Sequence, residues 1–250
     1  MSDQPFVKVA AAASGPVLLL CDHASNRVPD FVNGGDLGLS AHDMGRHIAY
    51  DVGAAGLTRK MAGLMGAPAL LSNFSRLVID PNRGADDPTL VMRLNDGSII
   101  PANRHVDAAE VTRRRDTLYT PYHDAITAQI DQMQADGHTP HILSIHSFTK
   151  QFLGRPVRPW QAGILWDTDD RIARPLISAL EAEGDLTVGD NQPYSGQLRG
   201  DCMYRHGTMR GLPHVLIEVR NDLIETPDGQ AEWAARLVRL ITPLIPVAGA

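Results

Sequence analysis

The sequence has little cysteine and no long apolar run. Cys21 and Cys202 are the two cysteines among 250 residues, too few for a disulfide framework or a cysteine-rich zinc site, and reduced thiols are typical of the cytoplasm. No run reaches the roughly 18 apolar residues that a membrane-spanning helix requires. Residues 9–21 are apolar, but Asp3 stands where a signal peptide carries positive charge. We therefore expect a cytoplasmic protein with no membrane partner.

Positive charge and several common active-site motifs are also scarce. The 23 Lys and Arg residues are outnumbered by 29 Asp and Glu residues, so the formal net charge is −6. This balance disfavours a nucleic-acid partner and, taken alone, an anionic substrate. The patterns GxGxxG, Walker A, HExxH, CxxC and GxSxG are absent. Dinucleotide binding, P-loop chemistry and a serine nucleophile elbow therefore lose support.

Short apolar runs alternate along the chain with longer amphipathic segments. Apolar runs of this length are typical of strands buried in a sheet, and the amphipathic segments of helices packed against it. The alternation predicts an α/β fold, a three-layer α/β/α sandwich around a mostly parallel mixed sheet, in a single domain over residues 1–250. We expect strands at 17–21, 69–71, 77–79, 142–145, 162–166 and 215–219, and helices at 41–65, 107–136, 169–183 and 228–243.

Local signals refine this picture. Ser40 is suited to cap the first helix, and Pro121 should kink or split the second. Residues 84–106 and 184–211 are polar or glycine-rich and are expected as excursions that can form a lid over a site.

Polar side chains follow three of the predicted strands where ligands bind in open α/β sheets. His23 follows the first of these strands and His146 ends a later one, while Glu218 and Arg220 end the last. Histidine is the commonest transition-metal ligand, and a catalytic zinc takes three protein ligands. His23 and His146 are therefore candidate metal ligands, although two isolated core histidines would show the same pattern.

The other candidates also have a functional and a structural interpretation. Glu218 and Arg220 share one face of a strand, as a general base beside an anion-binding group or as a structural ion pair. Arg76 and Arg83 flank a short apolar run, where the guanidinium groups suit a carboxylate, although a surface Arg–Asp network is the alternative. Pro121-Tyr122-His123 and His206 supply substrate contacts or pack structurally.

Several of these fragments occur in an order that resembles the N-formylglutamate amidohydrolase family, over about residues 16 to 240. That family is in turn similar to the zinc carboxypeptidases, which implies a zinc carboxypeptidase-like (phosphorylase/hydrolase-like) fold. By this resemblance His23 and His146 are zinc ligands, Asn82 and Arg83 hold the substrate carboxylate and the polarised carbonyl, and Glu218 is the general base. The fragments are Cys21-Asp22-His23-Ala24-Ser25-Asn26, Ser75-Arg76-Leu77-Val78-Ile79-Asp80-Pro81-Asn82-Arg83, Pro121-Tyr122-His123, Ile145-His146-Ser147-Phe148 and Ile217-Glu218-Val219-Arg220-Asn221-Asp222.

The third zinc ligand departs from the carboxypeptidase pattern. Carboxypeptidases carry a glutamate three residues after the first histidine, where this chain has Asn26. A neutral amide is a poorer zinc ligand than a carboxylate. Asp43 is the expected replacement, in a region where the amidohydrolase family has an acidic residue, and Asp22 is the second choice.

The resemblance implies a cytoplasmic amidohydrolase with one Zn²⁺ per chain that converts N-formylglutamate and water to glutamate and formate, a reaction of histidine degradation. Its small anionic N-acyl amino acid substrate would be bound by Arg76, Asn82, Arg83, His123, His206 and Arg220. The arginines would make the field at the site positive although the whole chain is negative. The alternatives are a carboxypeptidase-like or deacylase activity on another N-acyl amino acid or peptide, and a non-catalytic anion-binding protein.

Overall fold

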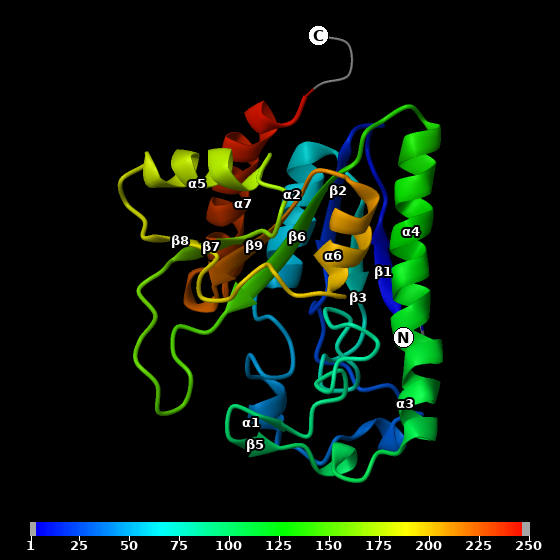
Figure 1. Cartoon of the computed structure of the whole chain (residues 1–250). Coiled ribbons are helices and arrows are strands. Elements are labelled where there is room, and N and C mark those ends of the chain that lie inside the picture. Colours follow the sequence, from blue (N-terminus) through cyan, green and yellow to red (C-terminus); the bar gives the residue numbers. More distant parts are fainter. Residues whose placement is uncertain (1–3, 247–250) are drawn as a thin grey trace.

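A seven-stranded sheet lies at the centre of the computed structural model, which describes residues 4–246 (Figure 1). Its strands are β1 (Phe6–Val9), β2 (Val17–Cys21), β3 (Ala69–Ser72), β6 (His141–Phe148), β7 (Ala162–Leu165), β8 (Val188–Asp190) and β9 (His214–Arg220). The order across the sheet is β1-β3-β2-β6-β9-β7-β8. The four neighbours β3, β2, β6 and β9 are parallel, whereas β1 and β7 pair antiparallel with β3 and β9.

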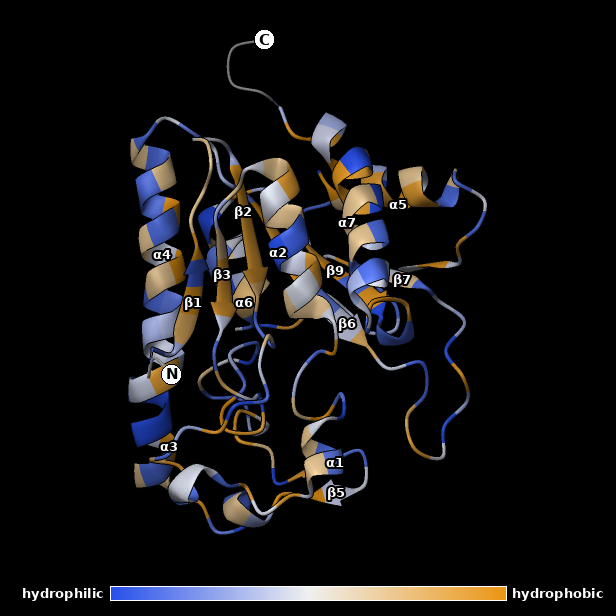
Figure 2. Cartoon of the chain, turned by 180° about the vertical axis from the view of Figure 1, so that it is seen from behind, coloured by the Kyte–Doolittle hydropathy of each residue, from blue (hydrophilic) through white to orange (hydrophobic). Residues whose placement is uncertain are grey.

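Helices cover both faces of this sheet, as Figures 1 and 2 show from opposite sides. They are α1 (Ala41–Met44), α2 (Ala54–Met65), α3 (Ala108–Arg114), α4 (Thr120–Ala135), α5 (Ala173–Glu181), α6 (Cys202–His206) and α7 (Pro227–Ile241). On one face α2, α5 and α7 contribute Leu57, Leu176 and Trp233 to one hydrophobic core. On the other, α4 and α6 contribute Ile126 and Met203 to a second. The predicted α/β sandwich with a mostly parallel sheet is confirmed.

The parallel strands explain where polar groups gather. All residues of β2 and β6 are buried, as expected for strands covered on both faces. The carboxyl ends of β2, β6 and β9 meet at one edge of the sheet, and the register of β6 and β9 sets His146 opposite Glu218. No helix among residues 4–246 is both long enough and apolar enough to cross a membrane.

The first predicted helix, 41–65, is wrong in its middle. Ser40 caps α1 through the backbone N–H of Asp43, as expected, but α1 ends at Gly45 and α2 starts only after Gly53. Gly53 has φ 83°, and a Cβ there would lie 2.1 Å from the carbonyl oxygen of Ile224. A glycine is required at this close approach, and the segment before it is a loop rather than a helix.

Other boundaries also differ from expectation. Residues 77–79 form a buried turn segment rather than a strand. The helix predicted over 107–136 is present as α3, a π-helical turn at Arg115–Tyr119 and α4, with Pro121 in the first turn of α4. The edge strands β1 and β8 were not predicted, and the two excursions contain a small hairpin, β4 (Leu94–Asn95) with β5 (Ser98–Ile99), and helix α6.

Candidate active site

A cavity of about 250 Å³ opens at the carboxyl ends of the parallel strands. His23 reaches it from just beyond β2, His146 from β6 and Glu218 from β9. Loops outside the sheet add the remaining walls, including Arg76 and Tyr194. The site therefore lies where the topology brings the strand ends together.

Two histidines and an aspartate form the centre of the site, which we call the cavity cluster (His23, Asp51 and His146). Nδ1 of His146 lies 2.9 Å from Oδ2 of Asp51, and Nδ1 of His23 lies 3.4 Å from the same oxygen. The two rings meet edge to face with centroids 4.9 Å apart. One donor atom from each of the three buried residues lies within 4.8 Å of the others.

Each imidazole is also hydrogen-bonded, on the side away from Asp51, to one further carboxylate. Nε2 of His23 donates to Oδ1 of Asp80 at 2.7 Å, and Nε2 of His146 donates to Oδ2 of Asp22 at 3.0 Å. Because an ionised carboxylate can only accept, it fixes the proton on Nε2 and directs Nδ1 of both rings toward Asp51. A carboxylate behind each histidine is the arrangement that orients metal-ligating histidines.

The buried charges depend on one another. Burial opposes ionisation of Asp51 and Asp22, but the neighbouring histidines hold the pKa of both carboxyls far below the usual range. Burial alone would lower the pKa of His146, yet its hydrogen bonds to Asp22 and Asp51 raise it well above normal. The cluster is therefore a compact set of opposite charges.

Glu218 is the carboxylate of the site that lacks a partner on one side. Its Oε2 is buried without a hydrogen-bond partner among the described residues. Burial, the largest influence, raises the pKa of this carboxyl to about 7, with Asp51 adding to the shift and His146 opposing it. An unpartnered carboxylate oxygen beside two imidazoles is suited to bind a water, a substrate or an ion.

These residues fit a zinc ion. Two imidazole nitrogens and one carboxylate oxygen are a common donor set of catalytic zinc, and the cavity beside them leaves room for a further ligand. Glu218 lines the same cavity. His23, Asp51 and His146 would hold the ion, with Asp80 and Asp22 behind them.

The third acidic member differs from the residue that the sequence favoured. Asp43 accepts hydrogen bonds from Arg46 and Ser40 and is not part of the cluster. Asn26 donates to the carbonyl oxygen of Met44, and Asp22 lies behind His146 rather than between the two histidines.

The sequence does not indicate Asp51 as a site residue, because the predicted helix over 41–65 would place it in mid-helix. The glycines that flank residues 46–52 were the available signal for a loop there. Within that loop the backbone N–H of Asp51 donates to the carbonyl oxygen of His23, which holds it beside the strand end.

The arginines of the site differ in their partners. Arg76 pairs with Oδ2 of Asp80 at 2.9 Å and with Oδ1 of Asp51 at 3.4 Å. Arg83 forms no ion pair among residues 4–246, and its Nη1 donates to the carbonyl oxygen of Asn82. Asn82 and Arg83 both line the cavity. The guanidinium of Arg83 is therefore available to an anion.

Three residues predicted to bind substrate lie outside the cavity lining. Arg220 pairs with Asp222 at 2.7 Å. His123 and His206 are buried and hydrogen-bonded to each other. The structure thus assembles His23, His146, Glu218, Arg76, Asn82 and Arg83 around one cavity.

The sheet topology and the histidines and carboxylates gathered at its strand ends are those of an α/β protein with a candidate active site. The sequence model of the family "N-formylglutamate amidohydrolase" matches residues 15–225. The chain belongs to this family.

Solved structures share the fold of this chain. A gene product of Agrobacterium tumefaciens has a TM-score of 0.90 and 37% identity, covering 96% of this chain and 94% of that chain. An N-formylglutamate amidohydrolase from Ralstonia eutropha has a similar fold, with a TM-score of 0.59 and 24% identity over 96% of this chain and 95% of that one. No match was found among the curated proteins.

Proposed function

We propose that this protein is a zinc-dependent amidohydrolase that cleaves the N-formyl amide of an amino acid, with N-formylglutamate as the expected substrate and glutamate and formate as products. The observation that carries the proposal is the cavity cluster with its neighbours. Two imidazoles are oriented by carboxylates, Asp51 offers a carboxylate between them, and Glu218 lies beside them with an oxygen that no described residue bonds. When bound, zinc supplies a Lewis acid that polarises an acyl oxygen and makes water more acidic.

Glu218 is the proposed general base. It lies opposite His146 in the register of β6 and β9, so its carboxylate faces the cavity cluster. It takes a proton from the attacking water and returns that proton to the nitrogen of the leaving amine. No described residue forms a hydrogen bond with Oε2, which leaves this oxygen available for the transfer.

The arginines have separate proposed roles. Arg83, with Asn82, binds the α-carboxylate of the substrate, since its guanidinium has no carboxylate partner among residues 4–246. Arg76 lies 3.2 Å from Nδ1 of His23 and so borders the reacting centre. There it stabilises the negative charge that develops on the acyl oxygen.

A substrate with an apolar side chain is the second candidate. Phe148, Phe152 and Leu216 give the cavity wall an apolar part. An N-acyl amino acid with an apolar side chain would bury against these residues, whereas glutamate needs a second polar contact. A panel of N-formyl and N-acetyl amino acids with acidic and apolar side chains separates the two candidates by their kcat/KM.

Glu218→Gln tests the mechanism. We expect the variant to keep its zinc and its substrate affinity but to lose about 10²–10⁴-fold in kcat, the contribution of a general base. Formate release and metal content are measured together, and Glu225→Gln, an exposed glutamate, is the control. Full activity of Glu218→Gln would remove the residue from the mechanism.

A further inference from the structure

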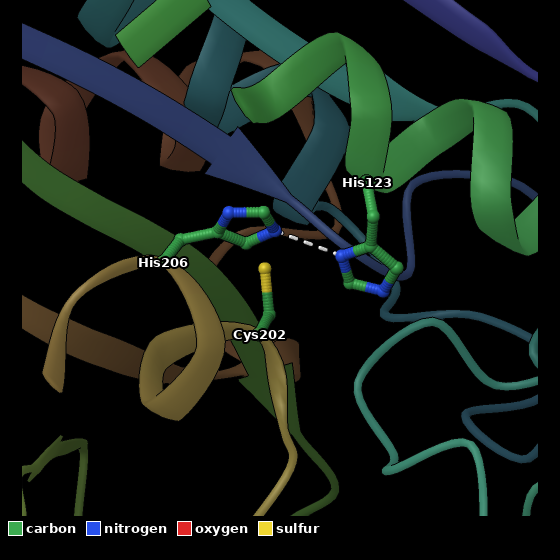
Figure 3. A group of neighbouring side chains, drawn as sticks. All are labelled: His123, Cys202 and His206. Carbon is green, nitrogen blue, oxygen red and sulfur yellow. Dashed lines mark hydrogen bonds between the residues drawn. The ribbon is translucent and has the colours of Figure 1, made fainter. Parts of the chain in front are cut away.

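A second group of metal-ligating side chains lies apart from the cavity, between α4 and α6 (Figure 3). We call it the α4–α6 cluster: His123 from α4 and Cys202 and His206 from α6. Their exposed fractions are 2%, 0% and 2%. None of the three lines the cavity, so the group is distinct from the proposed active site.

The donor atoms of this cluster converge. Nδ1 of His123 and Nε2 of His206 are 2.9 Å apart, and one donor atom from each of the three side chains lies within 4.8 Å of the others. Figure 3 shows the sulfur of Cys202 directed to the space beside this N···N contact. A single ion placed there would touch two nitrogens and a sulfur.

The hydrogen bonds around the cluster prepare His123 as a ligand. Its Nε2 donates to the carbonyl oxygen of Pro81 at 3.0 Å. A neutral imidazole that donates through Nε2 carries its lone pair on Nδ1, which is the atom that faces His206 and Cys202. The backbone thus selects the tautomer that a metal ion requires.

We propose that His123, Cys202 and His206 form a second, structural metal site for a borderline-soft divalent ion of the zinc class. Imidazole and thiolate are the donors that zinc prefers, and a closed site without solvent access is typical of structural rather than catalytic zinc. The thiol of Cys202 is hydrogen-bonded to Asp22, whose carboxylate also accepts a hydrogen bond from Nε2 of His146. An ion with thiolate and carboxylate beside it would bring little net charge into the core.

Binding changes the protonation of the ligands in a defined way. The thiol of Cys202 releases its proton to solvent when the metal–sulfur bond forms. His206 moves its ring proton to Nδ1, so that Nε2 binds the ion and the hydrogen bond to His123 is replaced. Because the three side chains are buried, the ion enters during folding or transient opening.

The cluster lies directly behind the loop that carries Asn82 and Arg83. His123 holds the carbonyl oxygen of Pro81, and the backbone N–H of Cys202 donates to Oδ1 of Asn82 at 3.1 Å. An ion that joins α4 to α6 would therefore fix two of the supports of this loop.

The test uses metal-free full-length protein loaded with zinc and, separately, with Co²⁺. The cavity cluster has no sulfur donor, so a thiolate-to-cobalt charge-transfer band in the near ultraviolet reports the α4–α6 cluster alone. We expect wild type to bind a second equivalent of metal and to show this band. Cys202→Ser should lose the band and the second equivalent while keeping the first. Cys21→Ala, which removes the other buried thiol, is the matched control and should keep both.

The outcomes separate this proposal from the proposed function. Wild-type protein that binds a single equivalent without a thiolate band, or a band that persists in Cys202→Ser, overturns the second site. In that case the cluster is a hydrogen-bonded histidine pair only. Because the band requires no turnover, an inactive enzyme with a thiolate band would instead contradict the amidohydrolase proposal and leave the metal site standing.

Discussion

The two pairs of buried histidines in this chain differ in what holds the outer nitrogen of the rings. In the cavity cluster the outer nitrogens of His23 and His146 donate to carboxylates. In the α4–α6 cluster His123 donates to a backbone carbonyl, and its other nitrogen bonds to His206. The rings of the first pair are therefore hydrogen-bonded to carboxylates, whereas those of the second pair are hydrogen-bonded to a backbone carbonyl and to each other.

This difference in partners sets the charge of equally buried rings. Hydrogen bonds to carboxylates overcome burial and raise the pKa of His146 well above its usual value. Burial, the largest influence, together with the nearby guanidinium of Arg205, lowers the pKa of His123 to about 3 and that of His206 to about 4. Burial without a carboxylate partner thus favours a neutral histidine, whereas carboxylate partners favour a charged one. The contrast matches an open catalytic site and a closed structural one.

Removing the central carboxylate of the cavity cluster should have the largest effect on zinc binding and turnover. Asp51→Asn replaces a proposed zinc ligand that is also the ion-pair partner of both cavity histidines. We expect loss of tightly bound zinc from the cavity cluster and no detectable turnover, measured by metal content and formate release.

Asp43→Asn is the matched control for this change. Asp43 was the ligand expected from sequence, and it lies in an ion pair with Arg46 instead. Its replacement should leave zinc binding and turnover near the wild-type values. The reverse result, with Asp43→Asn inactive and Asp51→Asn active, would return the assignment to the sequence-based expectation.

A carboxylate behind the metal ligands should matter less. Asp80→Asn weakens the hydrogen bond that orients His23 and the ion pair with Arg76. Changes of this kind typically cost about 10–100-fold in metal affinity or activity. Zinc affinity measured by competition with a chelator checks the prediction, with Asp87→Asn, an aspartate that accepts from Thr89, as the control. Unchanged affinity would show that the carboxylates do not orient the rings.

The α4–α6 cluster should respond mainly through stability. His206→Ala leaves Nδ1 of His123 buried without its partner, which costs about 1–3 kcal/mol in the free energy of unfolding. Urea unfolding of the metal-free protein measures the change, and the metal content of the zinc-loaded protein is measured beside it. If stability is unaffected and the cavity cluster loses its zinc instead, the division between the two clusters is wrong.

The sequence predicted correctly those site residues that lie at or next to the ends of regular strands. His23, His146 and Glu218 end buried parallel strands, and apolar runs next to polar residues reveal such positions. Asn82 and Arg83 lie in a buried loop rather than beyond a strand, yet they too reach the cavity. The strand ends of a parallel sheet converge regardless of the loop conformations. The predictions for strand-end residues therefore held although some loops and helix boundaries were predicted wrongly.

The sequence was misleading where a loop decides the geometry. Asp51 depends on the break between α1 and α2, which Gly53 makes possible through its contact with Ile224, a residue far away in the chain. Histidines such as His123 and His206 are typical of active sites. Here, however, the packing of α4 against α6 directs both side chains into the core instead of the cavity. Long-range packing of this kind leaves no periodic signal in a single sequence.

Formate release by zinc-loaded and metal-free protein tests the central claim most directly. Purified protein is stripped of metal, reloaded with two equivalents of zinc or left metal-free, and supplied with N-formylglutamate. The account predicts that the zinc-loaded protein releases formate and glutamate in equal amounts and that the metal-free protein releases neither. Equal rates from both forms, or no formate from the zinc-loaded form with any N-formyl amino acid, would contradict it.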